Sequence, residues 1–336
     1  MLIYQINYTK KTYFFHILYA IIFVGGNMKT KIFKTLDEQI EIMRSKGLII
    51  EDEENAKKIL FRENYFFING YRHMFTTNNK DRFIEGTKFD EVYATFVFDR
   101  RLRNIMFKYI LIIENNVKSI MSYQLSRKYG FKDKDYLNPD NFTQDSARVR
   151  QVHDIINKMK RQIRVNGRQH SATLHYLSNY GYIPMWILVK VLSFGIISEL
   201  FCILKYEDQK DIADLYNVDT QTLSIYLALL ANFRNLCAHE DILYDHRTNR
   251  VIPNNEYHNL LGIQKNEFNE YEYGKNDLYA IIMIMKHMLS EEEFRDIIYE
   301  IGYEIDILDG KVDTVPLNSI LNKIGFPNNW RDIVDL

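Results

Sequence analysis

The segment from residue 89 to residue 128 has a continuous helical pattern, and this pattern constrains the fold more than any other feature of the chain. Its apolar side chains recur at intervals of three and four residues, as one face of a long helix requires. They are Val92, Phe96, Leu102, Ile105, Met106, Tyr109, Ile113, Val117 and Ile120. A helix of this length needs partners along its whole apolar face, so we expect it to be the central element of a bundle.

The composition favours helices throughout the chain. Of the 336 residues, 46% are hydrophobic and only 14 are Gly and 5 are Pro. Apolar surface is therefore plentiful, and residues that break helices are few. No segment alternates apolar and polar side chains over a length that would sustain a sheet. We predict an all-α fold with a helical bundle at its centre.

Charge and cysteine content limit the expected partners and cofactors. The formal net charge is −1, so a nucleic-acid partner has to be bound by a local basic patch and not by the field of the whole protein. Cys202 and Cys237 provide neither a disulfide framework nor a set of metal ligands. We expect a cytoplasmic protein that uses no metal ion and no other cofactor.

The first 27 residues differ from the rest of the chain. An apolar run over residues 12–26 is too short to span a membrane comfortably, and no cleavage site of small residues follows it. The sequence that begins at Met28 is polar, as is usual for the N-terminus of a protein. We interpret residues 1–27 as an upstream extension of the gene, with a lone membrane anchor as the alternative, and we expect no stable membrane association.

Three regions are predicted after this extension. Residues 28–87 form an N-terminal helical cap, in which two short helices over residues 35–60 meet at Gly47; a helix-turn-helix is the alternative. Residues 88–305 form the main helical domain, and residues 306–336 form a C-terminal tail with a short helix. Further helices of the main domain are expected at residues 148–164, 184–204, 211–216, 218–240, 276–289 and 291–307, with a polar loop at 245–274.

The helix predicted at residues 218–240 carries the most informative side chains. Its apolar face is a core stripe of Leu223, Tyr226, Leu227, Leu230, Phe233 and Cys237. The other face places Ala228, Asn232, Asn235 and His239 at steps of four, three and four residues. Asn235 and His239 are neighbours on this face, so the amide can orient the imidazole. Arg234 is one position further around the helix and can reach the same pocket.

Arg234, Asn235 and His239 form a candidate catalytic group for RNA cleavage without a metal ion. Imidazole titrates near neutrality and can move a proton, and a fixed guanidinium can stabilise charge on the scissile phosphate. The ribose 2′-hydroxyl would attack, and the product would end in a cyclic phosphate. Arg148 and His153 repeat the spacing, but only Arg234 is followed directly by Asn. The alternative is that these residues have structural roles only. His239 would then interact with the last carbonyl groups of the helix, and Arg234 would form an ordinary surface ion pair.

A basic stretch over residues 148–170 is the predicted RNA-binding surface, because Asp154 is its only acidic residue and such an excess of positive charge suits a phosphate track. Its positive side chains are Arg148, Arg150, Lys158, Lys160, Arg161, Arg164 and Arg168. Candidates for base stacking follow at His170, His175, Tyr176 and Tyr180. A smaller patch on the helix at 89–128 comprises Arg100, Arg101, Arg103 and Lys118, with Lys108 as a further phosphate-binding candidate. The alternative for both patches is that these charged side chains only cover a solvent-exposed helix face and bind no RNA.

Five blocks of the sequence, in this order, resemble the Abi family of abortive-infection proteins (AbiD/AbiF-like). They are KTLDEQIEIMRSKGLII, NYFFINGYRHMF, FDRRLRNIMFKYILIIENNVKS, YGYIPMWILVKVLSFGIISEL and NFRNLCAHEDILYDHR, and they cover roughly residues 29–247. The Arg-Asn-x-x-x-His sequence at the end of an apolar helix resembles the motif of HEPN domains. HEPN domains are all-helical and are often ribonucleases in bacterial defence and toxin–antitoxin systems.

The resemblance implies an HEPN-like bundle, a role in phage defence and a metal-independent endoribonuclease. It implies Arg234 and His239 as the catalytic pair, with Asn235 as the supporting polar residue. RNA is the implied partner, and some relatives are linked to a small non-coding RNA. A non-catalytic HEPN-like module that holds an RNA or a partner protein is the second reading, and a DNA-binding regulator based on residues 36–60 is the third.

HEPN nucleases usually combine two motifs in one composite site, and this chain contains one complete motif. A homodimer that brings two copies of the 228–239 face together is the simplest way to complete the site. The alternative is a degenerate second half in the same chain, at Arg103 to Lys108, where Lys stands in place of His.

Overall fold

The computed structural model describes residues 32–77 and 81–336. Within these residues the chain forms fifteen α-helices and four short 3₁₀ helices, and the only β-type pairings are isolated bridges. This result confirms the prediction of an all-α fold. The predictions for residues 1–27 lie outside the described residues. No helix in the described part of the chain combines the length and apolar character needed to cross a membrane.

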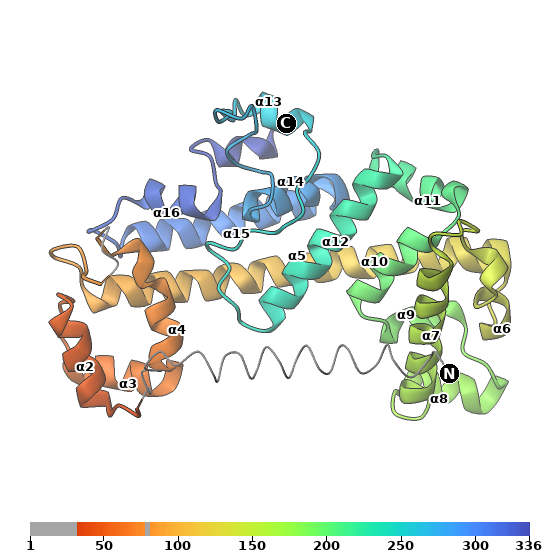
Figure 1. The fold of residues 1–336 in the computed structure, drawn as a ribbon, viewed down its shortest axis with the longest axis horizontal. Helices are drawn as coiled ribbons and strands as arrows, with labels where there is room; N and C mark the ends of the chain where they lie inside the picture. Colours follow the sequence, from red (N-terminus) through yellow and green to blue (C-terminus); the bar gives the residue numbers. More distant parts are fainter. Residues whose placement is uncertain (1–31, 78–80) are drawn as a thin grey trace, which may run out of the picture.

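A single helix, α5 (Phe89–Tyr129), extends along the long axis of the molecule (Figure 1). It confirms the long helix predicted at residues 89–128. At its start, the backbone N–H of Lys88 donates to the Glu91 carboxylate (3.1 Å). At its end, Gly130 has a φ of 92°, a conformation that favours glycine. The 41 residues of α5 therefore have defined boundaries and serve as the axis on which the other elements pack.

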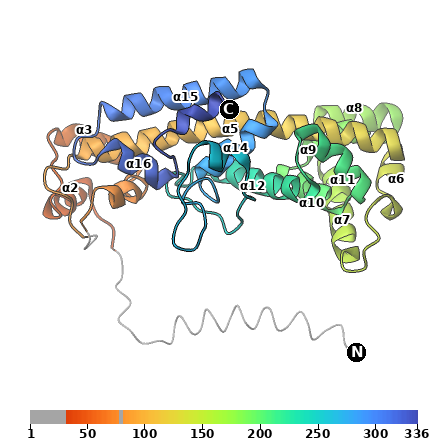
Figure 2. The ribbon, with the colours of Figure 1, turned by 90° about the horizontal axis from the view of Figure 1, so that it is seen from above.

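Helices α12 (Thr220–Ala238) and α15 (Glu291–Asp309) pack along α5. Figure 2 shows α15 beside α5. The ion pairs between these two helices join Arg101 to Glu304 (2.8 Å) and Lys108 to Glu300 (2.6 Å). Since the residue numbers increase in one helix while they decrease in the other, α5 and α15 are antiparallel.

The other helices gather at the two ends and on one side of α5 (Figure 1). Near its start are α2 (Leu36–Ser45), α3 (Glu53–Glu63), α4 (Tyr65–Asn69) and η1 (Gly70–Met74). Towards its other end are α6 (Asp133–Tyr136), η2 (Pro139–Asn141), α7 (Val149–Asn166), α8 (Ser171–Tyr180), α9 (Met185–Val191), α10 (Phe194–Ile203), α11 (Tyr206–Ala213) and η3 (Asp214–Tyr216). The remaining elements are α13 (Glu256–Leu260), α14 (Leu278–Met288), α16 (Leu317–Ile324) and η4 (Trp330–Val334).

The single helix predicted at residues 184–204 is wrong, because two helices, α9 and α10, occupy this segment. The backbone is extended at Leu192 (ψ 135°) and Ser193 (ψ 156°). The Ser193 hydroxyl accepts a hydrogen bond from the backbone N–H of Ile196 (3.4 Å) and so caps α10. The break allows α9 to pack on α5 while α10 packs on α12.

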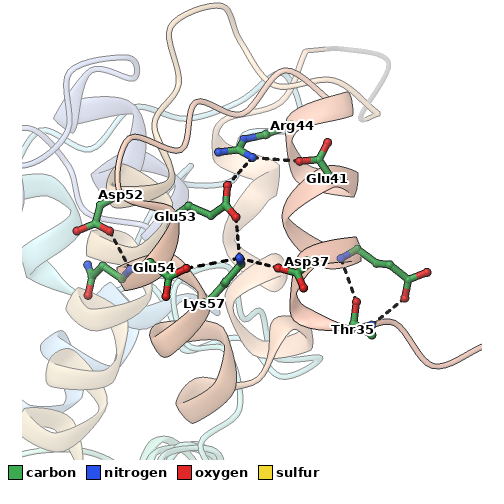
Figure 3. Close-up of polar contacts among 10 residues, drawn as sticks. Thr35, Asp37, Glu41, Arg44, Asp52, Glu53, Glu54 and Lys57 are labelled. Atoms are coloured by element: carbon green, nitrogen blue, oxygen red, sulfur yellow. Dashed lines mark hydrogen bonds and ion pairs between the residues drawn. The ribbon is translucent and has the colours of Figure 1, made fainter.

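The first two helices are held together by a network of charged side chains (Figure 3). The Lys57 ammonium lies 2.5 Å from Asp37 on α2 and 2.7 Å from Glu53 on α3. Arg44 on α2 also pairs with Glu53 (2.7 Å). Helix α3 carries three acidic and three basic side chains, so it lacks the basic face that a DNA recognition helix needs.

A buried ion pair on α5 fixes the chain segment that follows α12. Asp99 is fully buried and pairs with Arg103 one turn further along. It also accepts hydrogen bonds from the Tyr71 hydroxyl (2.7 Å) and from the backbone N–H of Leu243 (3.2 Å). Arg103 donates to the carbonyl oxygen of Asp241 (3.3 Å). Groups from distant parts of the sequence therefore converge here and attach the end of α12 to α5.

We expect Asp99→Asn to lower the free energy of unfolding by about 3 kcal/mol, because it leaves the Arg103 charge buried without a counter-ion. Urea denaturation followed by circular dichroism measures this change. Lys210→Ala is the matched control, since it breaks an exposed pair with Asp214 of the same i, i+4 spacing and should leave stability nearly unchanged. Equal effects of the two substitutions would contradict a structural role for the buried pair.

Candidate active site on helix α12

Helix α12 presents the face that the sequence predicts. Asp219 caps its start, because its carboxylate accepts from the backbone N–H of Thr222 (2.8 Å). The predicted core stripe is buried at all six positions, which are Leu223, Tyr226, Leu227, Leu230, Phe233 and Cys237. The polar side chains of the other face, Asn232, Asn235 and His239, are exposed.

Arg234 lies between α12 and α5 and is partly buried. Its Nε atom is 3.4 Å from a carboxylate oxygen of Glu114, and its guanidinium carbon is 5.4 Å from the centre of the Phe107 ring. The same carboxylate group accepts a hydrogen bond from the Lys118 ammonium (2.6 Å). Among the described residues, no hydrogen-bond partner is present for the terminal nitrogens of Arg234. The contact with Glu114 is thus an ion pair without a hydrogen bond at Nε, and the terminal nitrogens of Arg234 are left for a ligand.

Asn235 and His239 share a face of α12 but are not joined through their side chains. The contact between them is a backbone hydrogen bond, from the N–H of His239 to the carbonyl oxygen of Asn235 (3.0 Å). The chain then turns at Glu240, which has a φ of 57°. The predicted hydrogen bond between the Asn235 amide and the His239 ring is not formed in the described structure, so both groups point to solvent without orienting each other.

His246 is a second histidine near this face and was not predicted. Its Nε2 atom lies 3.2 Å from Oδ1 of Asn232, and its ring meets the edge of Phe233 with ring centres 5.2 Å apart. Partial burial lowers the pKa of the His246 imidazole. The contact crosses fourteen residues of sequence and depends on the path of the chain after α12, so no helical spacing could have revealed it.

The five cations of the predicted second RNA-binding patch on α5 are each paired with a carboxylate. The pairs are Arg100 with Glu63, Arg101 with Glu304, Arg103 with Asp99, Lys108 with Glu300 and Lys118 with Glu114. Arg103 is also only 3% exposed. In this structure the segment from Arg103 to Lys108 therefore offers no free arginine for a second half of an active site.

The basic side chains of the predicted RNA-binding surface are arranged differently. Helix α7 buries one face through Val152, Ile155, Ile156 and Met159. Five of the predicted cations are exposed and form no ion pair within residues 32–77 and 81–336, namely Arg150, Lys160, Arg161, Arg164 and Arg168. Arg148 donates to the carbonyl oxygen of Cys202 (2.7 Å), and Lys158 pairs with Glu199. Most of this surface is thus free for a ligand.

The predicted stacking candidates on α8 belong to a longer row of aromatic rings. The ring centres of Tyr176 and Tyr180 are 5.4 Å apart, and Tyr182 follows at 6.3 Å from Tyr180. Phe131 continues the row, 5.8 Å from Tyr182 and 5.6 Å from Trp186. Tyr182, Phe131 and Trp186 were not predicted, because Phe131 meets the other two rings only through the tertiary fold.

The described side chains do not form a recognisable metal site. Within that part of the chain, no group of three or more His, Cys, Asp or Glu side chains is placed to hold a metal ion. The imidazole and guanidinium groups of α12 can transfer a proton and stabilise negative charge.

A family model described as Abi-like protein matches residues 58–245, which is more than half of the chain and includes α5 and α12. The chain belongs to the Abi-like protein family. Membership supports a general role of this Abi-like protein in abortive infection, a form of phage defence. No curated protein and no solved structure matches the chain significantly.

In this Abi-like protein, we expect iodoacetamide to modify Cys202 well before Cys237. Alkylation requires the thiolate, and burial raises the pKa of Cys237 to about 12. Cys202 is partly exposed on α10, where its sulfur lies 3.1 Å from the Ser224 hydroxyl. Mass spectrometry of tryptic peptides gives the order of modification, and in denaturant both cysteines should react alike. Earlier modification of Cys237 in the folded protein would contradict the assignment of the core face of α12.

Proposed function

We propose that this Abi-like protein is a metal-independent HEPN-type endoribonuclease that cleaves RNA in phage defence. Arg234, Asn235 and His239 are its catalytic residues. The observation that carries the proposal is the C-terminal end of α12, where Asn235 and His239 are exposed and the partly buried Arg234 pairs with Glu114 while its terminal nitrogens have no partner among the described residues. A guanidinium and a solvent-exposed imidazole supplied by the same end of one helix suit phosphodiester chemistry.

The proposed reaction uses the RNA itself as nucleophile. His239 accepts the proton of a ribose 2′-hydroxyl, the 2′-oxygen attacks the adjacent phosphorus, and the bond from phosphorus to the 5′-oxygen breaks. A second imidazole donates a proton to the leaving 5′-oxygen. Arg234 stabilises the negative charge on the non-bridging oxygens, and Asn235 supports the bound phosphate by hydrogen bonding. The products are a 2′,3′-cyclic phosphate and a 5′-hydroxyl.

One chain contains a single Arg-Asn-x-x-x-His motif, and the other imidazole near this face, His246, faces Asn232, so a second copy of the motif would come from a partner. We propose a symmetric homodimer in which the exposed face of α12 approaches its copy and two His239 side chains flank one phosphate. The occupied cations of α5 support this choice over a second half from the same chain.

RNA is held, in this proposal, by the exposed cations of α7 and by the row of aromatic rings from Tyr176 to Trp186. Lys160 and Arg164, together with Lys134, also line a cleft of about 470 Å³ between α6 and α7. Cations beside exposed aromatic rings are typical of surfaces that bind single-stranded nucleic acid.

We expect the protein to cut end-labelled RNA in EDTA and the His239→Ala variant to lose this activity by roughly 100-fold or more, because the proton acceptor is removed. Gel electrophoresis and analysis of the product termini for a 2′,3′-cyclic phosphate measure the result. His73→Ala replaces an exposed histidine on η1 and serves as the matched control. If neither the protein nor His239→Ala cuts RNA while both bind it, the non-catalytic RNA-binding function is correct.

We expect the double substitution Lys160→Ala and Arg164→Ala to weaken binding of single-stranded RNA and to make it less dependent on salt. Each lost phosphate contact should reduce the slope of log K against log salt by about 0.7. Fluorescence anisotropy at several salt concentrations gives the slope. The control pair, Lys58→Ala and Lys311→Ala, removes the same charge from exposed positions elsewhere. An unchanged slope for the α7 variant would exclude α7 from the RNA-binding surface.

A further inference from the structure

A cleft of about 490 Å³ lies beside the polar face of α12. Its walls come from α12, from α10, from the start of α7 and from the segment after α12. The lining residues on which the argument depends are Cys202, Ala228, Asn232, His246, Arg247 and Arg250. A cleft of this volume can hold one small polar molecule of the size of a nucleotide.

The polar groups in this cleft suit the edge of a nucleobase. Because the Asn232 atom that faces His246 is the amide oxygen, Nε2 of the imidazole carries the hydrogen and donates it. Nδ1 of the neutral ring is then left as an acceptor. The Asn232 amide nitrogen forms no hydrogen bond with the described residues, so these two residues supply the cleft with one donor and one acceptor, the types of group that recognise a base edge.

The open side of the cleft suits a phosphate group. Arg247 donates to the carbonyl oxygens of His246 (3.0 Å) and Lys323 (2.8 Å), and these contacts leave its charge without a counter-ion. Arg250 likewise forms no ion pair with the part of the chain that the structure describes. The acidic residue of the lining, Glu199, is paired with Lys158. The cleft therefore keeps a net positive charge.

The cleft also lies between the basic surface of α7 and His239, the two regions that the proposed function requires. Asn232 precedes His239 by seven residues of α12, which corresponds to about 10 Å along the helix axis. Gln151, from the first turn of α7, lines the opposite wall, next in sequence to the exposed Arg150. A strand of RNA that reaches from the α7 surface to His239 would therefore pass this cleft.

We propose that the cleft binds one unpaired nucleotide of the RNA substrate, with its base against Asn232 and His246 and its phosphate towards Arg247 and Arg250. The inference rests on the proposed function, because that function supplies RNA as the ligand. It adds a substrate class: the RNA has to be single-stranded next to the cleavage point, since a paired base cannot leave the helix without loss of stacking and pairing energy.

The single cysteine of the cleft allows a direct test on the full chain. The rate of iodoacetamide modification of Cys202 is measured by mass spectrometry with and without a 2′-O-methyl oligonucleotide of about ten residues. This oligonucleotide cannot be cut, because its 2′-oxygen is blocked. We expect Cys202 to react roughly tenfold more slowly when about nine-tenths of the protein is bound, and we expect a blunt duplex of the same sequence to give no protection. Equal protection by the duplex, or none by the single strand, overturns the proposal.

Two variants separate a nucleotide in the cleft from RNA that only lies over it. His246→Ala removes a base contact, and Ala228→Leu fills the cleft from the partly exposed surface of α12 without deleting a core side chain. We expect both to lose the protection of Cys202 while the salt-dependent affinity of α7 for the oligonucleotide persists. Full protection in both variants would overturn the proposal.

The protection of Cys202 can be measured whether or not the protein cleaves RNA, so the two proposals can fail separately. Protection of Cys202 in a protein that does not cut ordinary RNA would contradict the nuclease and keep the nucleotide site. Cleavage that depends on His239, without protection of Cys202, would keep the nuclease and remove the site.

Discussion

The buried pair of Asp99 and Arg103 is the interaction on which the geometry of the candidate site depends. A helix ends in carbonyl groups without helical partners, and its last turn readily frays. Here the two residues of α5 bind the backbone of Asp241 and Leu243, just beyond the last residue of α12. The final turn of α12, with Asn235 and His239, is thereby held against a helix that is itself packed over its whole length.

The two basic helices of the protein illustrate how the same residue types acquire different roles. Helix α5 lies between acidic partners, and its cations hold the fold together by pairing with Glu63, Glu300 and Glu304. Helix α7 lies at the surface, and among the described residues Lys158, with Glu199, is the one cation of this helix that forms an ion pair. From the sequence alone, both helices are predicted to carry a basic patch. The neighbours decide whether that charge is neutralised or remains available.

The elements that could be predicted from the sequence are those that depend on local periodicity. The length of α5 and the core stripe of α12 follow from apolar residues three and four positions apart, and both are confirmed. The break between α9 and α10 could not be predicted in the same way, because both sides of Ser193 are apolar and the cap is a single hydroxyl. The contact of His246 with Asn232 and the burial of Arg103 depend on long-range packing. The catalytic roles of Arg234 and His239 stay predictions.

The rigidity of α5 has a consequence for where an RNA would be cut. The end of α12 is attached to α5 at Arg103, while Trp186, the last ring of the aromatic row, shares a cleft with Ser119 of the same helix. Sixteen residues of continuous α-helix separate these two attachment points, which corresponds to roughly 25 Å. An RNA gripped by the aromatic row and cut at His239 would be cleaved at a set distance from the grip. Helix α5 would then act as a molecular ruler, and the position of the cut would be determined by geometry as well as by base sequence.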